Sequence, residues 1–433
     1  MEDAMGRMSR RPKLLFLCHT LPYPPDGGCW MRTYHILRLL AEAFEITALC
    51  FERSGSSGAR DDQAQVAREG LAGLAAVEVF PLPQRHSRLR FVSDHLRSVA
   101  HHRVFTTYVY QSRAFHRRLA ELLASTKFDL VHVDSLDLAR YLPACGDLPV
   151  VAVHHDIEST VLRHRADIEP RTVPRAYLRY QSRRMAEVER HWCPRIALNV
   201  TMSERDRDRL ASLVPGSRIA VVPNGVDTNE FQPDSIRGIG VAYVGGTSPF
   251  PNRDALEFFA EDVLPHLRAS APLVPVRWIG RASPDQQRGF GARYGIELTG
   301  YVEDVRPLLR DAACHIVPLR VGGGTRLKIL TSWAMGKPVV STSVGCDGLD
   351  AVDGENILIR DDPAAFAAAV ARVLDDAALG RRLGERGRET VERRYGWNVI
   401  GDQMNDAYLA LLHGESRAVV ASPLGGHPDY AHG

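Results

Sequence analysis

Short, mostly apolar runs alternate with longer helical or polar stretches along the first half of the chain. Runs of this kind are typical of strands that are buried on both faces of a parallel sheet. The stretches between them are long enough for helices that cover both faces, so the pattern predicts a doubly wound α/β domain. The runs are LLFLCHT, EITALCF, VEVFPL, DLVHVD, PVVAVHH, IALNVTMS and IAVVPN.

The same pattern starts again after a polar stretch that follows Pro233. The second series is IGVAYVGG, VPVRWIG, IELTGY, CHIVPL, PVVST and NILIRDD. A chain of 433 residues, 45% of them apolar, is too long for a single core. The repeat therefore predicts two doubly wound domains in tandem. We expect a first domain over 1–235, a second over 236–396, a helix over 397–413 that packs back on the first domain, and a disordered tail over 414–433.

Composition narrows the compartment and the partners. The seven cysteines are odd in number and form no CxxC pair, which argues against a disulfide framework and a zinc site and favours a reducing compartment. The apolar run near the N-terminus is too short for a signal peptide, and no stretch approaches the roughly eighteen apolar residues of a membrane span. The net charge of +2 does not favour a nucleic-acid partner. These features predict a cytoplasmic protein.

Positive charge is concentrated in two stretches of the predicted first domain. Residues 81–120 contain eight arginines and five histidines against one acid, Asp94, and a second basic stretch covers 171–192. Such charge is often a solvated surface. The alternative is a surface that contacts anionic lipid headgroups at the inner face of a membrane, or a phosphate-bearing acceptor. The residues to test first are Arg175, Arg179, Tyr180 and Arg183.

The segment IVPLRVGGGTRLKILTSWAMGKPVVST, 316–342, predicts a strand, a glycine loop, a short helix and a strand. Three glycines let the loop bring its amide groups close to a ligand, and the helix start adds positive potential. Arg326 and Lys328 open the helix, so the expected ligand is an anion. Thr325 can cap the helix, and Gly336 suits its left-handed exit, which predicts about three turns.

Other polar or glycine-rich loops also follow predicted strands directly, where ligands of doubly wound sheets bind. Five such loops can converge only if the two domains face each other across a central cleft. The residues that we select in them are Gly28, Asn224, Gly245 and Gly246, with His155, Asp156 and Glu158 after the strand 150–153. A polar cluster at the end of a buried strand is costly unless it is used or solvated.

The chain resembles GT-B glycosyltransferases of family 4, the glycosyl transferases group 1. The resemblance covers about residues 12–410, and its most specific parts are VVPNGVD, just before the domain repeat, and GGGTRLKIL with the WAMGKPVVST that follows. It implies a fold of two Rossmann-like doubly wound parallel-sheet domains that face a central cleft. It also implies a retaining glycosyltransferase that uses a nucleotide-diphosphate sugar, a hydroxyl acceptor such as a glycan, glycolipid or natural product, and neither a metal nor another cofactor.

The resemblance assigns roles to individual residues. Arg326 and Lys328 would stabilise the leaving diphosphate, and His155 would lie near the transferred sugar or the acceptor hydroxyl. Further donor contacts would come from Gly28, Gly245, Gly246, Gly323, Gly324, Thr325 and Thr331, and acceptor-side contacts from Arg32, Asp156, Glu158 and Asn224. Thr331 departs from the pattern, because relatives carry there an acid that holds the ribose hydroxyls.

Two alternatives remain open at this stage. The same fold supports nucleotide-sugar epimerases, which need acids near the sugar, and Asp156 and Glu158 could serve as those acids. Thr331 also raises the possibility of a binding protein whose donor site is impaired. A threonine hydroxyl replaces only one ribose hydrogen bond and brings no charge, so we expect weaker donor binding rather than none.

Overall fold

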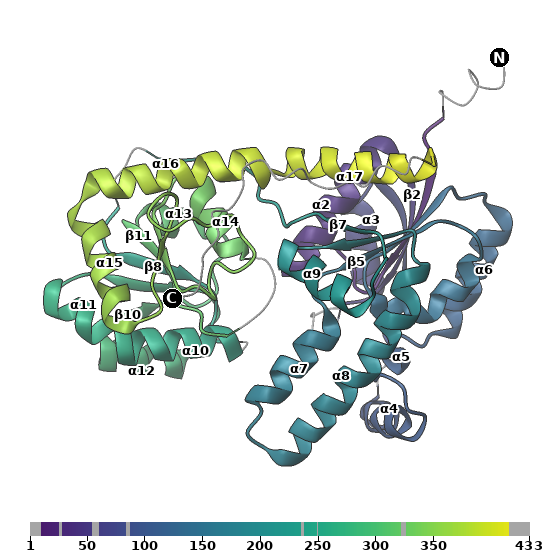
Figure 1. Ribbon diagram of the computed structural model, residues 1–433, viewed down its shortest axis with the longest axis horizontal. Coiled ribbons are helices and arrows are strands. Elements are labelled where there is room, and N and C mark those ends of the chain that lie inside the picture. The colour runs from purple at the N-terminus through teal and green to yellow at the C-terminus, as the bar shows by residue number, and fades with distance from the viewer. Residues whose placement is uncertain are drawn as a thin grey trace. The chain divides into compact units, whose positions relative to one another are not determined.

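The computed structural model describes residues 10–25, 28–53, 60–83, 87–234, 238–248, 250–321 and 326–414. The chain divides into two compact units (Figure 1). Unit 1 is Met1–Val222 with Gly401–Gly433, and unit 2 is Pro223–Ile400. The division falls at 222–223, whereas the sequence placed it at 235–236. Of the predicted disordered tail, only Gly414 lies within the described residues.

Unit 1 is built on a parallel sheet in which the described residues form seven strands, in the order β3-β2-β1-β4-β5-β6-β7. Each of the seven apolar runs of the first series supplies one strand, which confirms that prediction. Chain order reverses between β1 and β4, so the loops that follow these two strands diverge at the carboxyl edge of the sheet. The strands are β1 Lys13–Cys18, β2 Glu45–Phe51, β3 Ala75–Phe80, β4 Leu130–Val133, β5 Val150–His154, β6 Leu198–Thr201 and β7 Ile219–Val221.

Helices cover this sheet because their apolar faces pack on its buried strands. Phe115 of α6 stacks on Phe51 of β2 with ring centroids 4.6 Å apart, and both side chains are fully buried. The helices are α2 Gly28–Ala43, α3 Arg60–Gly70, α4 Arg88–Ala100, α5 Thr106–Val109, α6 Arg113–Ser125, α7 Glu158–Ile168, α8 Thr172–Trp192 and α9 Glu204–Leu213, with short 3₁₀ helices η2 Leu136–Cys145 and η3 Cys193–Arg195.

Unit 2 repeats the plan with a parallel sheet of six described strands, in the order β10-β9-β8-β11-β12-β13. Every run of the second series becomes a strand, again as predicted. Trp278 of β9 and Trp333 of α14 are fully buried in its core. The strands are β8 Val241–Val244, β9 Val276–Ile279, β10 Ile296–Leu298, β11 Cys314–Val317, β12 Val339–Ser341 and β13 Leu358–Ile359. The helices are α10 Phe250–Phe258, the π-helical turn η4 Phe259–Val263, α11 Leu264–Ser270, α12 Pro284–Tyr294, α13 Arg306–Arg310, α14 Leu327–Ala334, α15 Pro363–Asp375 and α16 Ala377–Arg394.

The last helix, α17 Trp397–Leu412, starts in unit 2 and continues in unit 1 from Gly401 onward. In unit 1 it packs closely on α2, because a Cβ at Gly401 would lie 2.6 Å from Cδ2 of Leu39. Tyr408 of α17 is fully buried, and its ring lies edge-on to Phe44. Within the described part of the chain, no helix combines the length and apolar character needed to cross a bilayer.

Candidate active site

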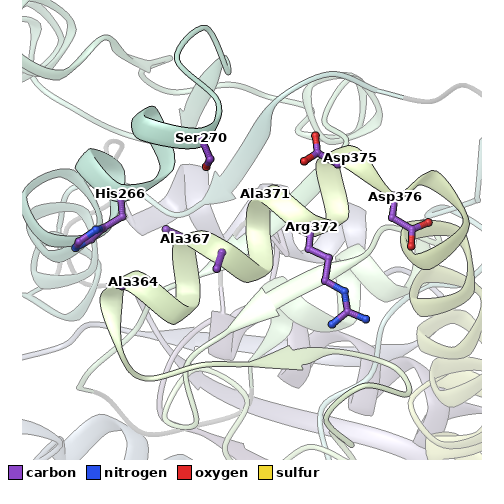
Figure 2. Close-up of a pocket in the computed structure, with 9 residues that line it drawn as sticks. His266, Ser270, Ala364, Ala367, Ala371, Arg372, Asp375 and Asp376 are labelled. Carbon is purple, nitrogen blue, oxygen red and sulfur yellow. The ribbon is translucent and has the colours of Figure 1, made fainter.

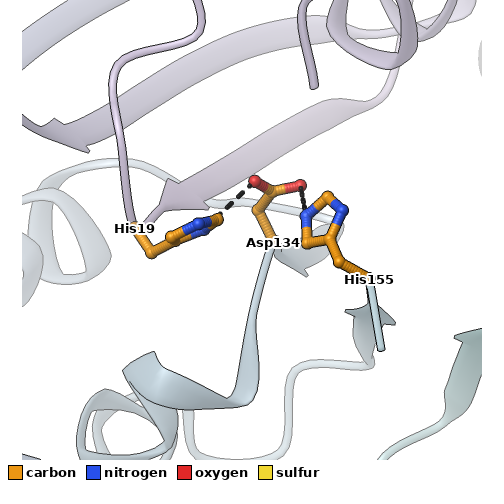
Figure 3. A group of neighbouring side chains, drawn as sticks. All are labelled: His19, Asp134 and His155. Carbon is orange, nitrogen blue, oxygen red and sulfur yellow. Dashed lines mark ion pairs between the residues drawn. The ribbon is translucent and has the colours of Figure 1, made fainter. Parts of the chain in front are cut away.

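Three polar side chains meet where β1, β4 and β5 of unit 1 end. His19 follows β1, Asp134 follows β4, and His155 follows β5. Figure 3 shows Asp134 between the two imidazoles. One carboxylate oxygen, Oδ2, lies 3.4 Å from Nδ1 of His19, and the other, Oδ1, lies 3.4 Å from Nε2 of His155. The imidazole of His155, which the sequence singled out, is thus oriented by the carboxylate of Asp134.

Asp134 also contacts groups inside the domain. Its Oδ2 accepts a hydrogen bond of 2.9 Å from Oγ1 of Thr33 on α2 and a longer one of 3.5 Å from the thiol of Cys18. Nε2 of His132, two residues earlier on β4, lies 3.5 Å from Oδ1. Asp134 itself is 2% exposed. The carboxylate is therefore the centre of a buried polar cluster that reaches the surface through His19 and His155.

Asp134 is ionised in this cluster. Burial by itself raises the pKa of a carboxylic acid, but attraction to His155 and the polar contacts from His132, His155 and His19 outweigh it. Together they hold the pKa of Asp134 well below its usual value. The same carboxylate fixes which imidazole nitrogen of His155 faces inward, so it leaves the other nitrogen to face outward.

Arg32 of α2 supports the cluster from inside unit 1. The side chain is 2% exposed, and its Nη2 donates a 2.8 Å hydrogen bond to the carbonyl of Val222. Burial lowers the pKa of Arg32 to about 10, although attraction to Asp134 and Tyr408 works in the opposite direction. The sequence analysis placed Arg32 among acceptor-side contacts. The structure places its guanidinium in the interior, where it acts on the cluster through the charge of Asp134.

Acidic groups gather at the start of α7, next to His155. Burial, with smaller contributions from the nearby carboxyl groups of Asp137, Asp156 and Glu189, raises the pKa of Glu158 to about 8. Burial likewise raises the pKa of Asp137. Glu158 is therefore mostly protonated at neutral pH and can donate a hydrogen bond, whereas an ionised carboxylate could only accept one.

His154, the neighbour of His155, has a structural role. Its side chain is buried at the end of β5, and its Nε2 lies 3.0 Å from Oδ1 of Asn199 on β6. Burial lowers the pKa of His154 to about 4, so the imidazole is neutral at physiological pH. The two consecutive histidines consequently face different environments and perform different tasks.

The cluster of His19, Asp134 and His155 also has the residue types of a metal site. One ligand atom from each residue lies within 4.8 Å of the others. However, the two oxygens of Asp134 are directed at different histidines, and Thr33 and Cys18 donate to Oδ2 as well. The described contacts fit a hydrogen-bonded carboxylate that orients two imidazoles.

Unit 2 gathers positive charge at the start of α14. Nζ of Lys328 donates hydrogen bonds to the hydroxyl of Tyr243, at 2.5 Å, and to Oδ1 of Asn252, at 3.1 Å. The ammonium also lies 4.3 Å from the centroid of the Tyr243 ring, which is a favourable cation–π geometry. Arg326 is 7% exposed, and its Nη2 donates a 2.9 Å hydrogen bond to the carbonyl of Val344.

Burial and the nearby charge of Arg326 make the amine of Lys328 harder to protonate. Among the described residues, burial and then repulsion from Arg326 lower the pKa of Lys328 to about 7. Lys328 also acts on its neighbour. Burial, followed by the charge of Lys328, lowers the pKa of His315 on β11 to about 3, so this imidazole is neutral. An anion bound beside Arg326 and Lys328 would relieve the repulsion between them.

The sequence-based description of α14 needs two corrections. The helix has eight residues, or about two turns, where three were expected. Its N-cap position is Arg326, and Thr325 lies outside the described residues. The exit is as predicted, because Gly336 adopts a left-handed φ of 63°. At Thr331 the hydroxyl donates a 2.8 Å hydrogen bond to the carbonyl of Leu327 in its own helix.

Glycines in the loop after β8 allow close backbone packing. A Cβ at Gly246 would lie 2.7 Å from the carbonyl oxygen of Arg281, and one at Gly245, where φ is +156°, would lie 2.6 Å from the Tyr243 ring. The structure therefore explains both glycines by packing, and a ligand role is compatible with it. Gly28 is the first residue of α2. Gly323 and Gly324 lie outside the described residues.

The PNGVD segment, 223–227, belongs to unit 2. Val226 pairs with Gly396, and a Cβ at Gly225 would lie 2.5 Å from the Trp397 ring. The segment therefore packs against the start of α17. Asn224, which the sequence analysis placed on the acceptor side, lies in this segment of unit 2 and is partly exposed.

One hollow of unit 2 lies away from these residues. It holds about 690 Å³ and is lined by alanines of α15 together with His266 and Ser270 of α11 (Figure 2). Ser270 precedes β9 and Asp375 ends α15, so this hollow does not lie at the carboxyl edge of the sheet. Because ligands of doubly wound sheets bind at the carboxyl edge, it is not a candidate active site.

Sequence reasoning selected His155 but missed His19 and Asp134. Both follow apolar runs directly, LLFLC before His19 and LVHV before Asp134. The rule that selected His155, a polar residue just after a buried strand, selects these two as well. Their convergence depends on β1, β4 and β5 being neighbours in the sheet, which the sequence alone does not reveal.

Comparison with known families and proteins agrees with this architecture. Residues 26–230 match the family described as Glycosyltransferase Family 4, and residues 238–376 match the family described as Glycosyl transferases group 1. Phosphatidyl-myo-inositol mannosyltransferase of Mycobacterium tuberculosis is 26% identical over 326 residues, which are 71% of this chain and 81% of that protein. The lipopolysaccharide core biosynthesis glycosyltransferase LpsE of Rhizobium meliloti is 36% identical over 130 residues, or 28% of this chain and 35% of that protein.

Solved structures show the same fold. Anabaena HepE, crystallised in complex with UDP, superposes with a TM-score of 0.63 over 92% of this chain and 100% of its own, at 15% identity. Sucrose-phosphate synthase of Thermosynechococcus elongatus also gives a TM-score of 0.63, over 93% of this chain and 100% of its own, at 16% identity. The two sheets and the two family matches lead to one conclusion: this chain is a GT-B glycosyltransferase of the glycosyl transferases group 1, similar to family 4.

Proposed function

We propose that this glycosyltransferase moves a sugar from a nucleotide-diphosphate sugar to a hydroxyl acceptor and retains the configuration at the anomeric carbon. One observation carries the donor assignment. Arg326 and Lys328 bring two cations together at the start of α14, and burial together with Arg326 lowers the pKa of Lys328 to about 7. A diphosphate is the natural counter-charge for such a pair. The complexes of HepE with UDP and with UDP-glucose support the same class of donor.

The cations would act on the leaving group. In the proposed reaction the bond between the anomeric carbon and the diphosphate oxygen breaks, and the acceptor oxygen bonds to that carbon on the same face. The acceptor proton passes to the departing diphosphate. Negative charge therefore grows on the diphosphate in the transition state, and preorganised cations stabilise that charge. This mechanism needs no protein nucleophile.

Unit 1 would supply the group that positions the sugar or the acceptor hydroxyl. His155 is half-buried at the carboxyl edge of the sheet, and Asp134 holds its Nε2 at 3.4 Å. The imidazole therefore presents Nδ1 for a hydrogen bond. In this scheme Asp134 is a positioning residue that acts through His155.

The test begins with binding. Thermal shift with UDP, GDP and ADP identifies the base, because a ligand specific for the folded state raises the melting temperature. Replacing Arg326 or Lys328 by alanine should greatly reduce that shift and abolish donor turnover. The matched control is Arg277→Ala, since Arg277 is a unit 2 arginine that pairs with the exposed Glu297 on the sheet surface. Unchanged turnover in both site variants would refute the assignment.

Three further assays define the reaction. The anomeric coupling constant in the NMR spectrum of the product reports retention or inversion. Incubation with donor alone separates a transferase from an epimerase, because an epimerase converts the donor without any acceptor. We also propose that the reaction needs no metal, since Arg326 and Lys328 take the charge-stabilising role, so EDTA should leave the rate unchanged.

A further inference from the structure

Helix α4 exposes its apolar face and turns its polar face to the domain. Its apolar residues recur every three or four positions, which places them on one helix face. That face points outward: Leu89 is 85% exposed, Val92 57%, Leu96 66% and Val99 48%. The face turned to the domain carries Asp94 and Ser98, both fully buried.

A helix of the same length in the same unit shows the ordinary arrangement. α4 and α6 each have thirteen residues and several arginines. α6 buries Phe115, Leu119 and Leu122 and turns its charged residues to the surface. α4 exposes its apolar residues, so its orientation does not follow from burial of apolar area.

Polar contacts hold α4 in this orientation. The buried Asp94 is paired within its own helix, where it lies 3.2 Å from Nη1 of Arg97 and 3.6 Å from Nε of Arg90, and Ser98 attaches the helix to other segments. Ser98 accepts a 2.8 Å hydrogen bond from Gln181 of α8, and its hydroxyl donates to the carbonyl of Arg103 at 2.7 Å. The hydroxyl of Tyr180 on α8 also donates to the Ser98 carbonyl at 2.9 Å. The reversed orientation is thus built into the packing.

Aromatic contacts complete the attachment of α4. His95 stacks on Phe105 with ring centroids 3.7 Å apart and an interplanar angle of 2°. Its Nδ1 lies 2.5 Å from the hydroxyl of Tyr177 on α8. Figure 1 shows α4 beside α8 and outside the sheet of unit 1. The helix therefore presents a fixed apolar surface to its surroundings.

The charges around this surface are positive. Between residues 87 and 105 the sequence has Arg88, Arg90, Arg97 and Arg103 against a single acid, Asp94. Asp94 is buried and contacts two of these arginines, so it adds no acidic group to the surface. An apolar helix face bordered by arginines matches the interface of an anionic bilayer, where acyl chains lie beneath negative headgroups.

We propose that the exposed face of α4, formed by Leu89, Val92, Leu96 and Val99, binds in the plane of an anionic phospholipid membrane. The helix lies along the interface, with its apolar residues among the upper acyl chains and its arginines at the headgroups. This contact would hold the glycosyltransferase at a lipid surface, whatever its acceptor. The proposal does not depend on the donor assignment, because none of its residues belongs to the candidate active site.

The residues of α8 that the sequence singled out for testing make contacts within unit 1. The hydroxyl of Tyr180 donates to the Ser98 carbonyl, so Tyr180 supports α4 from behind. Arg179 and Arg183 line a hollow of about 620 Å³ between α7 and α8. Arg175 donates a 2.7 Å hydrogen bond to the carbonyl of Glu169. The membrane surface proposed here therefore centres on α4.

Vesicle flotation with the full-length protein tests the proposal. Wild type should float with vesicles of phosphatidylcholine and phosphatidylglycerol at a ratio of 7:3, and float at least about tenfold less with pure phosphatidylcholine. The variant with both Leu89→Glu and Leu96→Glu should lose at least about tenfold in partition to the anionic vesicles. Because both side chains are well exposed, the variant should keep the circular dichroism spectrum and the melting temperature of wild type.

A control variant and a second measurement decide whether a membrane or a second copy of the chain covers the exposed face of α4. Leu273 of unit 2 is 92% exposed, so Leu273→Glu adds the same charge at an equally exposed leucine and should leave flotation unchanged. Arg88→Glu should weaken flotation and reduce its dependence on salt. Equal flotation of wild type and the α4 variant would overturn the proposal. So would absence of flotation together with a dimer in sedimentation velocity that the α4 variant converts to a monomer.

Discussion

The polar clusters of the two units differ in how their charges are balanced. In unit 1 the buried carboxylate of Asp134 is surrounded by the imidazoles of three histidines, by a hydroxyl and by a thiol. In unit 2 the central groups are two cations, Arg326 and Lys328, and the pKa of Lys328 is lowered to about 7 by burial and then by Arg326. The first cluster is stable as it is, whereas the second is stabilised by an incoming anion.

This difference suggests a division of labour. A carboxylate that is satisfied within the domain orients a side chain, and here it orients His155. A cation pair that repels itself favours a ligand of opposite charge and gains from it. Variants in unit 1 should therefore affect stability and the rate of transfer, and variants in unit 2 should affect donor binding. The predictions below test that separation, from the largest expected effect to the smallest.

Asp134→Asn should have the largest effect. Removing the charge leaves Arg32 buried beside a neutral group, and loss of one partner from a buried charge pair costs about 3–5 kcal/mol. We expect the free energy of unfolding, measured in urea at pH 7, to fall by that amount. Asp147→Asn is the matched control, because Asp147 is exposed in the loop before β5 of the same sheet. Its effect should stay within about 0.5 kcal/mol.

The difference in stability between wild type and Asp134→Asn should depend on pH. The folded-state pKa of Asp134 lies well below its usual value, so its contribution to stability is complete above the unfolded pKa of about 3.9 and is lost as pH falls below it. Wild type and Asp134→Asn should therefore differ most near pH 7 and converge as the pH falls below about 4. A gap that stays constant down to pH 2 would mean that Asp134 is not held in its ionised form.

His155→Ala should slow transfer and leave donor binding intact. Loss of a hydrogen bond that positions the reacting groups should reduce kcat by about 10²-fold, while the Kd for the nucleoside diphosphate should change less than about twofold, because the diphosphate contacts are assigned to unit 2. His164→Ala is the control, since His164 is exposed on α7. A large rise in Kd for His155→Ala would remove the proposed separation of roles.

Thr331→Glu should strengthen donor binding. The hydroxyl of Thr331 donates to Leu327 within α14, and the family resemblance implies that an acid at this position would hold the ribose. A charged hydrogen bond contributes about 1.5–3 kcal/mol, so the Kd for the preferred nucleoside diphosphate should fall roughly ten- to hundredfold. Thr331→Val, which has the same shape without the hydroxyl, should change the Kd little. Unaltered affinity in Thr331→Glu would show that this helix position does not face the ribose.

The strands were predictable because each one is marked locally. Thirteen apolar runs were identified, and each became a strand in the predicted order of the chain. His155 was also predictable, since a polar residue at the end of a buried strand is conspicuous. Asp134 and His19 carry the same mark, but their meeting depends on β1 and β4 being neighbours, although more than a hundred residues separate them in the chain.

Two features conflict with local rules. An amphipathic helix is expected to bury its apolar face, but α4 buries Asp94 and Ser98, and Ser98 is bound by Gln181, which is distant in the chain. The length of α14 was overestimated at both ends, because the helix begins at Leu327 and ends at Ala334, two residues before the left-handed Gly336. In both cases the outcome depends on contacts that sequence spacing does not encode.

The most direct test of the central claim is proton uptake when the nucleoside diphosphate binds. A bound diphosphate should raise the pKa of Lys328, so at pH 8 binding should draw a proton from the buffer, and calorimetry in two buffers of different ionisation enthalpy measures that uptake. Affinity should then fall by up to about tenfold per pH unit above pH 7. Wild type should take up most of one proton and Lys328→Met close to none. Binding with no proton uptake in wild type, or equal uptake in the variant, would contradict the assignment of Arg326 and Lys328 as the diphosphate site.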